Sequence, residues 1–279
     1  IDHDPSGEKF ELIFANLDRQ IRTWLEINSS GKFIILPDLR PNEAWFRANP
    51  GNRLIDAFGK EASVVSFGSE IFYKACSDFL NRLVKRLKEQ DYYSNLVGFM
   101  PWVCGAPDSV MGGTEKNTWQ TDRKKLTVGD FHPAALEKFR VYLRDKYQNN
   151  PALLQKAWKQ TDVNFQDATP KIEQLIATAT GEEVLRDPAE SGMMCFDYAD
   201  FLPTLLGNFQ RRLCAQIKND TERKKMIFVH YGFIIAHMRG LNTPGGTLNN
   251  NNFDLPAWLA DDNIDGYIGA PSYSHRFSG

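Results

Sequence analysis

Four short apolar runs, each separated from the next by a longer stretch with helical spacing, constrain the fold of this chain more than any other feature. The runs lie near residues 33, 96, 227 and 266. Strands that alternate with helices pair in parallel, because the intervening helix returns the chain to the same end of the sheet. The chain is therefore predicted to be an α/β protein built from repeated β/α units.

The spacing of apolar residues between these runs supports the alternation. Ser69 suits the N-cap of a helix, and Pro133 suits the first helical residue. Pro203 is expected within the first turn or two of its helix, where the missing N–H of a proline is tolerated. The predicted helices span residues 10–27, 69–90, 133–147, 151–158, 196–218 and 255–260.

Composition places the chain among globular proteins and argues against two classes of partner. Its 279 residues are 42% hydrophobic and 24% charged, with a formal net charge of −2. Lys and Arg are spread along the predicted helices, and no apolar run approaches the ~20 residues that cross a bilayer, so neither a nucleic-acid nor a membrane partner is expected. The cysteines are widely separated, which predicts neither a zinc site nor a disulfide framework. The chain opens on Ile1 rather than Met, as expected of a processed or excised segment.

The loop that leaves the second strand is the first place to look for chemistry. Residues 96–99 read as a buried strand, and the chain then passes through Trp102 to a lone carboxylate, Asp108. Ligands of parallel α/β proteins bind at the carboxyl ends of the strands. Asp108 is therefore a candidate catalytic residue with Trp102 beside it, although a turn cap after Pro107 is an equally ordinary role.

The other strand exits also carry polar and aromatic side chains. The first exit holds Asp38, Arg40 and Trp45, which suit a polar cleft or, alternatively, a solvated loop with one packing tryptophan. The third strand ends in His230 and Tyr231. The fourth exit holds Tyr273 and Arg276. We expect these side chains to gather at one face of the sheet.

Length and loops bear on the domain organisation. After Asp108 comes a long loop with Glu115, of a kind that is usually functional or disordered in compact domains. A polar, partly helical excursion is expected over about residues 130–190, and residues 1–279 are expected to form a single domain or a fragment of one. A complete (β/α)8 TIM-type barrel needs about 250 residues. Because the loops and the excursion consume length, the four strands are expected to be only part of such a barrel.

Several segments resemble one known family. They are residues 130–147, 153–158, Phe165, the loop 41–50 with Trp45, residues 186–188, Asp197 with Tyr198, and the exit 270–276. Together they resemble the family 42-like glycoside hydrolases, the β-galactosidase-type enzymes of a large retaining clan with a (β/α)8 barrel. Residues 130–158 are similar to the excursion that follows the fourth barrel strand in that family.

The resemblance implies an assignment of strands and of catalytic groups. The visible strands would be the third to the sixth of the barrel, with the chain beginning just before the third. The acid/base carboxylate of the family follows the fourth strand, where this chain has Asp108 in place of Glu, with Glu115 on the same loop as the alternative. The nucleophilic Glu follows the seventh strand, so it would lie beyond Gly279, and residues 1–279 alone are expected to be inactive.

The predicted function is hydrolysis of a β-linked, galactoside-like sugar by a retaining mechanism, which needs two carboxyl groups about 5 to 5.5 Å apart. Trp102, Trp45 and Tyr273 would stack on sugar rings, and Tyr231 would line the same site. Hydrogen bonds to hydroxyl groups would come from Asp38, Arg40, His230 and Arg276. Each of these residues also has an alternative role in core or loop packing. No cofactor is expected, and association of copies through the barrel is left open.

Two other functions compete. The first is a barrel that binds carbohydrate without catalysis, because Asp108 replaces the Glu of the family. The second is a metal-dependent TIM-barrel hydrolase that uses His230, His275, Asp38 and Asp108. No HxH or HExxH spacing supports the second alternative, so no metal site is predicted.

Overall fold

A computed structural model describes residues 8–56, 58–101, 103, 129–171, 193–230 and 254–268, and it confirms the parallel sheet. Its four strands are β1 (Phe33–Ile35), β4 (Leu96–Phe99), β5 (Met226–His230) and β6 (Gly266–Ile268). They lie in the order β1-β4-β5-β6, and every neighbouring pair is parallel. The four predicted strands are therefore all present, and their carboxyl ends share one edge of the sheet.

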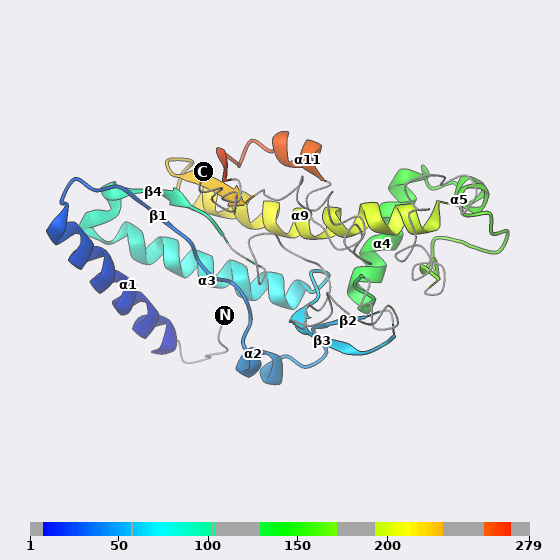
Figure 1. Ribbon diagram of the computed structural model, residues 1–279, viewed down its shortest axis with the longest axis horizontal. Helices are drawn as coiled ribbons and strands as arrows, with labels where there is room; N and C mark the ends of the chain where they lie inside the picture. The colour runs from blue at the N-terminus through cyan, green and yellow to red at the C-terminus, as the bar shows by residue number, and fades with distance from the viewer. Residues whose placement is uncertain are drawn as a thin grey trace, which may run out of the picture.

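Four helices precede these strands in the chain and pack against the sheet or against one another (Figure 1). They are α1 (Glu8–Ile27), α3 (Glu70–Lys88), α9 (Met194–Asp220) and the short α11 (Leu255–Leu259). Ser69 caps α3 as predicted, since its hydroxyl accepts a hydrogen bond from the N–H of Phe72. Helices α3 and α9 run side by side, and the rings of Phe72 and Phe209 stack between them at 5.3 Å. This interface forms the centre of the hydrophobic core.

Two of the predicted helices lie in the described part of the excursion after β4. They are α4 (Pro133–Lys146) and α5 (Pro151–Trp158), each with proline at its amino end. The side chains of His132 and Asn150 cap these two helices. Helix α4 packs on α9, where the rings of Phe139 and Tyr198 meet edge to face at 5.2 Å.

An antiparallel hairpin between β1 and α3 was not predicted. Its strands are β2 (Arg53–Ile55) and β3 (Glu61–Val65), and the short helices α2 (Glu43–Ala48) and η1 (Asp91–Asn95) also belong to the fold. The turn is held by Asp56, whose side chain accepts hydrogen bonds from the N–H groups of Phe58 and Lys60. Gly59 takes a φ of +78°, which suits glycine. The strands are too short and too evenly mixed in polarity to stand out in the sequence.

The prediction for Pro203 was wrong. Helix α9 starts at Met194, so Pro203 lies in the helix interior rather than in its first turns. A proline there removes one backbone hydrogen bond of the helix. The hydroxyl of the following residue, Thr204, donates to the carbonyl of Asp200 at 3.0 Å. The packing of α9 against α3 and α4 outweighs the local cost of the proline.

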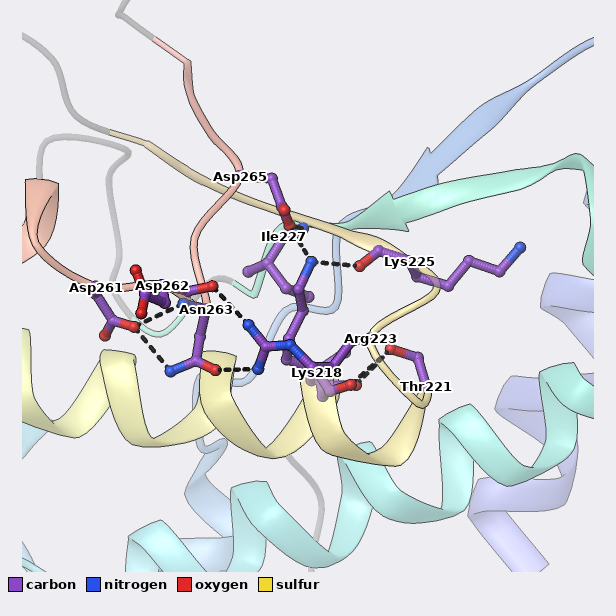
Figure 2. Close-up of polar contacts among 10 residues, drawn as sticks. Lys218, Thr221, Arg223, Lys225, Ile227, Asp261, Asp262, Asn263 and Asp265 are labelled. Carbon is purple, nitrogen blue, oxygen red and sulfur yellow. Dashed lines mark hydrogen bonds and ion pairs between the residues drawn. The ribbon is translucent and has the colours of Figure 1, made fainter.

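A polar cluster around the buried Lys218 holds the amino ends of β5 and β6 (Figure 2). The Lys218 ammonium pairs with the carboxylate of Asp265 and donates to the carbonyl of Lys225 at 3.0 Å. The Asp265 carboxylate also accepts the N–H of Ile227 at 2.7 Å. Arg223 reaches across to the side chain of Asn263 at 3.0 Å. The cluster fixes the register at the edge opposite the candidate site, where barrel proteins concentrate stability rather than chemistry.

No helix within the described ranges combines the length and the apolar character needed to cross a membrane.

Candidate functional site

The carboxyl edge of the sheet is the candidate site, and hydrogen bonds fix its backbone next to β1 and β4. The N–H of Met100, just past β4, donates to the carbonyl of Ile35 at 2.8 Å. The side chain of Gln210 on α9 donates to the carbonyl of Pro101 at 3.1 Å. At the other end of the sheet, His230 pairs with Ile268 in the β5–β6 register. The four strand exits therefore open on one side, as the sequence predicts.

The structure describes Asp38 and Arg40 at the exit of β1, and they form a two-point ion pair. Arg40 Nε lies 2.9 Å from Asp38 Oδ1, and Arg40 Nη2 lies 2.6 Å from Asp38 Oδ2. The backbone N–H of Arg40 donates to Asp38 Oδ1 as well. Both side chains remain about half exposed to solvent. The pair thus presents a planar, hydrogen-bonding group at the open edge of the sheet.

The charge state of Asp38 follows from this pairing. Partial burial favours the neutral acid, but the hydrogen bonds and the positive charge of Arg40 outweigh it and lower the pKa of Asp38 below its usual range. Asp38 is therefore ionised at neutral pH and accepts hydrogen bonds. A group that gives up its proton so readily is poorly suited to act as a general acid.

Trp45 lies in the core. Its side chain belongs to α2, whose amino end is capped by Asn42, and only 2% of the residue is exposed. Its ring meets the ring of Phe72 edge to face at 5.5 Å and that of Phe46 at 5.4 Å. This burial favours the packing alternative for Trp45 over an open platform for a sugar ring.

Most of the other predicted site residues lie outside the described part of the chain. They are Trp102, Asp108, Glu115, Tyr231, Tyr273, His275 and Arg276. For His230 the structure gives the backbone position at the carboxyl end of β5. The roles assigned to these residues stay predictions.

A buried network centred on Asp130 fixes the chain where it enters α4. Asp130 is fully buried, and its carboxylate accepts the hydroxyl of Ser66 at 2.6 Å and the N–H of His132 at 3.1 Å. The hydroxyl of Tyr198 on α9 lies 3.0 Å from both the N–H and the carbonyl oxygen of Asp130. Gly129, at φ +80°, packs so closely on the Tyr198 ring that a Cβ would lie 2.5 Å from it. This segment therefore has a single defined position against α9.

Burial also changes the pKa of the Asp130 carboxyl group. Removal from water raises the pKa of Asp130 to about 6, although the hydrogen bonds from Ser66 and His132 act in the opposite direction. The shift makes Asp130 a carboxyl group that titrates near neutral pH inside the core.

The same segment ties the unpredicted hairpin to the helical excursion. The N–H of Phe131 donates to the carbonyl of Ile55 at 2.7 Å, which adds a short backbone link to β2. A ring nitrogen of His132, Nε2, lies 2.7 Å from the carbonyl of Gly51. Since Nδ1 of His132 accepts the N–H of Ala134, Nε2 carries the proton and donates to Gly51. The hairpin and α4 are thus held as one unit beside the site.

A second buried carboxylate, Asp197, joins three helices. Its Oδ2 accepts the hydroxyl of Tyr147 and the indole N–H of Trp158, both at 2.7 Å. The ammonium of Lys146 lies 3.0 Å from Oδ1. Burial alone would lower the pKa of Lys146, but Asp197 and Asp200 raise it, so Lys146 stays charged. This cluster holds α4, α5 and α9 together.

Sequence reasoning missed the structural roles of Asp130 and Asp197, and each had a local signal. Asp197 interrupts an otherwise apolar stripe of α9, where a charge requires partners from other elements. Asp130 lies two residues before the N-cap of α4, a position typical of side chains that bond to the following backbone. Among the described residues, no group of three or more His, Cys, Asp or Glu side chains could hold a metal ion.

Several solved structures have a fold similar to that of this chain. The chain is similar to the catalytic domain of β-amylase from Paenibacillus polymyxa, with a TM-score of 0.62 and 13% identity over 88% of this chain and 63% of that chain. It is similar to a GH42 β-galactosidase from G. stearothermophilus, with a TM-score of 0.55 and 14% identity over 82% and 28% of the two chains. A β-galactosidase from Bacillus circulans sp. alkalophilus gives a TM-score of 0.50 and 15% identity over 78% and 29%.

No protein-family model and no curated protein sequence matches the chain. The chain spans 63% of the β-amylase catalytic domain and less than a third of the two β-galactosidases. At these identities the likeness is one of fold. The four-stranded α/β structure therefore has the fold of part of a glycoside hydrolase.

Proposed function

We propose that this chain is part of the catalytic barrel of a glycoside hydrolase that acts on a β-linked, galactoside-like sugar with retention of configuration. The observation that carries the proposal is the parallel sheet with all four exits at one edge, in a fold shared with β-amylase and β-galactosidases. In barrel enzymes that edge holds the catalytic groups. The four strands would be the third to the sixth of the barrel.

The described pair at the exit of β1 suits a role in substrate binding. Asp38 is ionised and accepts hydrogen bonds, and Arg40 donates them, so the pair matches the hydroxyl groups of a sugar. Neither group is placed to provide a proton. We propose that Asp38 and Arg40 orient the sugar while the acid/base chemistry comes from the loop after β4.

In this mechanism Asp108 protonates the leaving oxygen and later activates water, with Glu115 as the alternative on the same loop. The nucleophile would be a carboxylate outside residues 1–279, about 5 to 5.5 Å from the acid/base group in the assembled site. Trp102 and Tyr273 would stack on the sugar, and His230, Tyr231 and Arg276 would bind its hydroxyl groups. Residues 1–279 alone would therefore bind sugar weakly and hydrolyse none.

The test is made in the complete polypeptide that contains this chain. Asp108→Asn should lower the turnover of an aryl β-galactoside by about 10²- to 10⁴-fold, the usual contribution of general acid/base catalysis. Azide should restore part of the activity of that variant by replacing the water nucleophile. The exposed Asp162→Asn, on a loop between helices, serves as the control and should leave turnover unchanged. If Glu115→Gln alone removes activity, the acid/base role moves to Glu115.

A barrel that binds carbohydrate without catalysis is the second candidate, and the observation that favours it is Asp108 in the place of the family's Glu. The shorter side chain moves its carboxyl group by about one methylene, whereas catalytic geometry tolerates about 0.5 Å. Sugar binding by the complete protein, measured by titration calorimetry, with no turnover of any aryl glycoside would support this candidate.

A further inference from the structure

Gln210 of α9 is a polar residue within a buried stripe of its helix. Its neighbours one turn away on either side include Leu206, Leu213 and Cys214, all of which are buried. Residues three and four positions apart share one face of a helix, so Gln210 lies on the face of α9 that packs into the core, and it is itself partly buried. A polar side chain in that position requires a hydrogen bond to compensate for its removal from water. The partner of Gln210 therefore indicates what the glutamine does there.

That partner lies at the carboxyl end of β4. Gln210 Nε2 donates to the carbonyl oxygen of Pro101 at 3.1 Å, and Pro101 is buried, so its carbonyl needs a donor from the protein. One residue earlier the sheet still supplies the bond, since the N–H of Met100 donates to the carbonyl of Ile35 at 2.8 Å. A proline has no N–H, so the ladder of hydrogen bonds along β4 cannot continue through Pro101. Gln210 therefore holds the chain from the helix side where the sheet stops.

This bond is one of three contacts that fix the first residues after β4. Met100 and Val103 are 7% and 3% exposed, and the side chain of Val103 belongs to the hydrophobic core. Met100 is thus held by β1, the carbonyl of Pro101 by α9, and Val103 by the core. The two acid/base candidates, Asp108 and Glu115, follow Val103 in the sequence. The direction in which the chain leaves the sheet toward these carboxyl groups is therefore set by these contacts.

A second glutamine of α9 has a different kind of partner. The side chain of Gln216 accepts the hydroxyl of Ser77 at 2.6 Å and donates to the carbonyl of Ser77 at 2.8 Å. Ser77 belongs to α3, so this pair of bonds joins two helices and has no contact with a strand exit. The bond from Gln210 ends instead at the exit of β4, the edge of the sheet where barrel enzymes carry their catalytic groups.

We propose that Gln210 is a positioning residue of the proposed glycosidase, which holds the carbonyl of Pro101 and thereby sets the placement of the acid/base carboxyl group after β4. The inference rests on the proposed function and adds to it a residue that touches neither the sugar nor the reacting atoms. A displacement of about 1 Å lowers the rate of an enzyme by up to about 100-fold. Because the displaced group is the general acid, the loss should be large for a poor leaving group, which needs a proton, and small for a good one, which leaves as a stable anion.

The test measures kcat/KM of the complete polypeptide for two aryl β-galactosides that differ in the leaving group, phenol or dinitrophenol. Gln210→Met keeps about the size of the side chain and removes the donor to Pro101. It should lower kcat/KM for the phenyl galactoside by about 10- to 100-fold, and that for the dinitrophenyl galactoside by about 3-fold at most. Gln216→Met is the matched control on the same helix. It should lower the melting temperature by about 2 to 4 °C and leave kcat/KM for both substrates unchanged.

The other outcomes separate this inference from the proposed function. If the wild type is active and Gln210→Met loses nothing, or loses equally on both substrates, Gln210 has no positioning role and the proposed function stands. If the wild type hydrolyses neither galactoside, the proposed function fails and the inference fails with it. Should Gln210→Met not fold, Gln210→Glu keeps the length of the side chain, and its ionised carboxylate cannot donate to Pro101. That variant should then show the same difference between the two substrates at neutral pH, and equal losses would overturn the proposal.

Discussion

The buried carboxyl group of Asp130 gives the chain a specific dependence of stability on pH. Asp130→Asn keeps the size of the side chain and its acceptor for the N–H of His132, and the amide can donate to the hydroxyl of Ser66 in place of the reverse bond. The substitution therefore removes the titration while leaving the packing of α4 against α9 in place. Any pH-dependent difference between the two proteins belongs to Asp130.

The magnitude follows from the shift in pKa. The folded value is about 6 against 3.8 for the free side chain, and this difference corresponds to about 3 kcal/mol. Because the folded pKa is raised, the folded state binds more protons than the unfolded state between these values. The contribution of Asp130 to stability is therefore greatest below pH 4, falls as the pH rises to about 6, and is constant above it.

The assay is urea unfolding of the wild type and of Asp130→Asn at pH 4, 5, 6 and 7. Relative to the variant, the wild type should lose about 2 kcal/mol of unfolding free energy between pH 4 and pH 7. Asp145→Asn, an exposed position on α4, controls for general effects of charge and should track the wild type. A difference between the wild type and Asp130→Asn that stays constant with pH would refute the reasoning.

Three further predictions concern single side chains. Trp45→Ala should lower the unfolding free energy by about 3 to 5 kcal/mol, as expected for a buried tryptophan, and a loss below 1 kcal/mol in urea unfolding would contradict its place in the core. Lys218→Met should cost about 1 to 3 kcal/mol, because the carbonyl of Lys225 and the carboxylate of Asp265 lose a hydrogen-bond donor, and thermal unfolding without a clear shift would count against the cluster. Asp38→Asn should weaken sugar binding, measured by titration calorimetry, and should change the unfolding free energy by about 0.5 kcal/mol at most. An unchanged affinity for the sugar would show that Asp38 is not part of the binding site.

The parallel sheet was predictable because its signals are local. Each strand is a short apolar run followed by turn residues, and each helix repeats its apolar positions at the helical period. The caps at Ser69 and the prolines at the starts of α4 and α5 were read correctly for the same reason. Parallel pairing then follows from the crossover helices and not from any single residue.

What the sequence did not reveal depends on contacts between distant residues. Asp130 meets Ser66 and Tyr198 across 64 and 68 positions, and Asp197 meets Tyr147 across 50. No local period marks such pairs. Trp45 had two interpretations in the sequence, and only its contact with Phe72 of α3 favours packing. Tertiary packing also explains Pro203, since α9 continues through a residue that would end an isolated helix.

The central claim is that this chain supplies one carboxylate of a retaining glycosidase and another part of the polypeptide supplies the nucleophile. The most direct measurement is covalent trapping of the complete protein with an activated 2-deoxy-2-fluoro-galactoside, followed by peptide mass spectrometry. This reagent forms the glycosyl-enzyme intermediate of a retaining mechanism and slows its hydrolysis. The account predicts one labelled carboxylate outside residues 1–279 and none at Asp108. A label on a carboxylate within residues 1–279, or a complete protein that is neither labelled nor active on aryl glycosides, would contradict it.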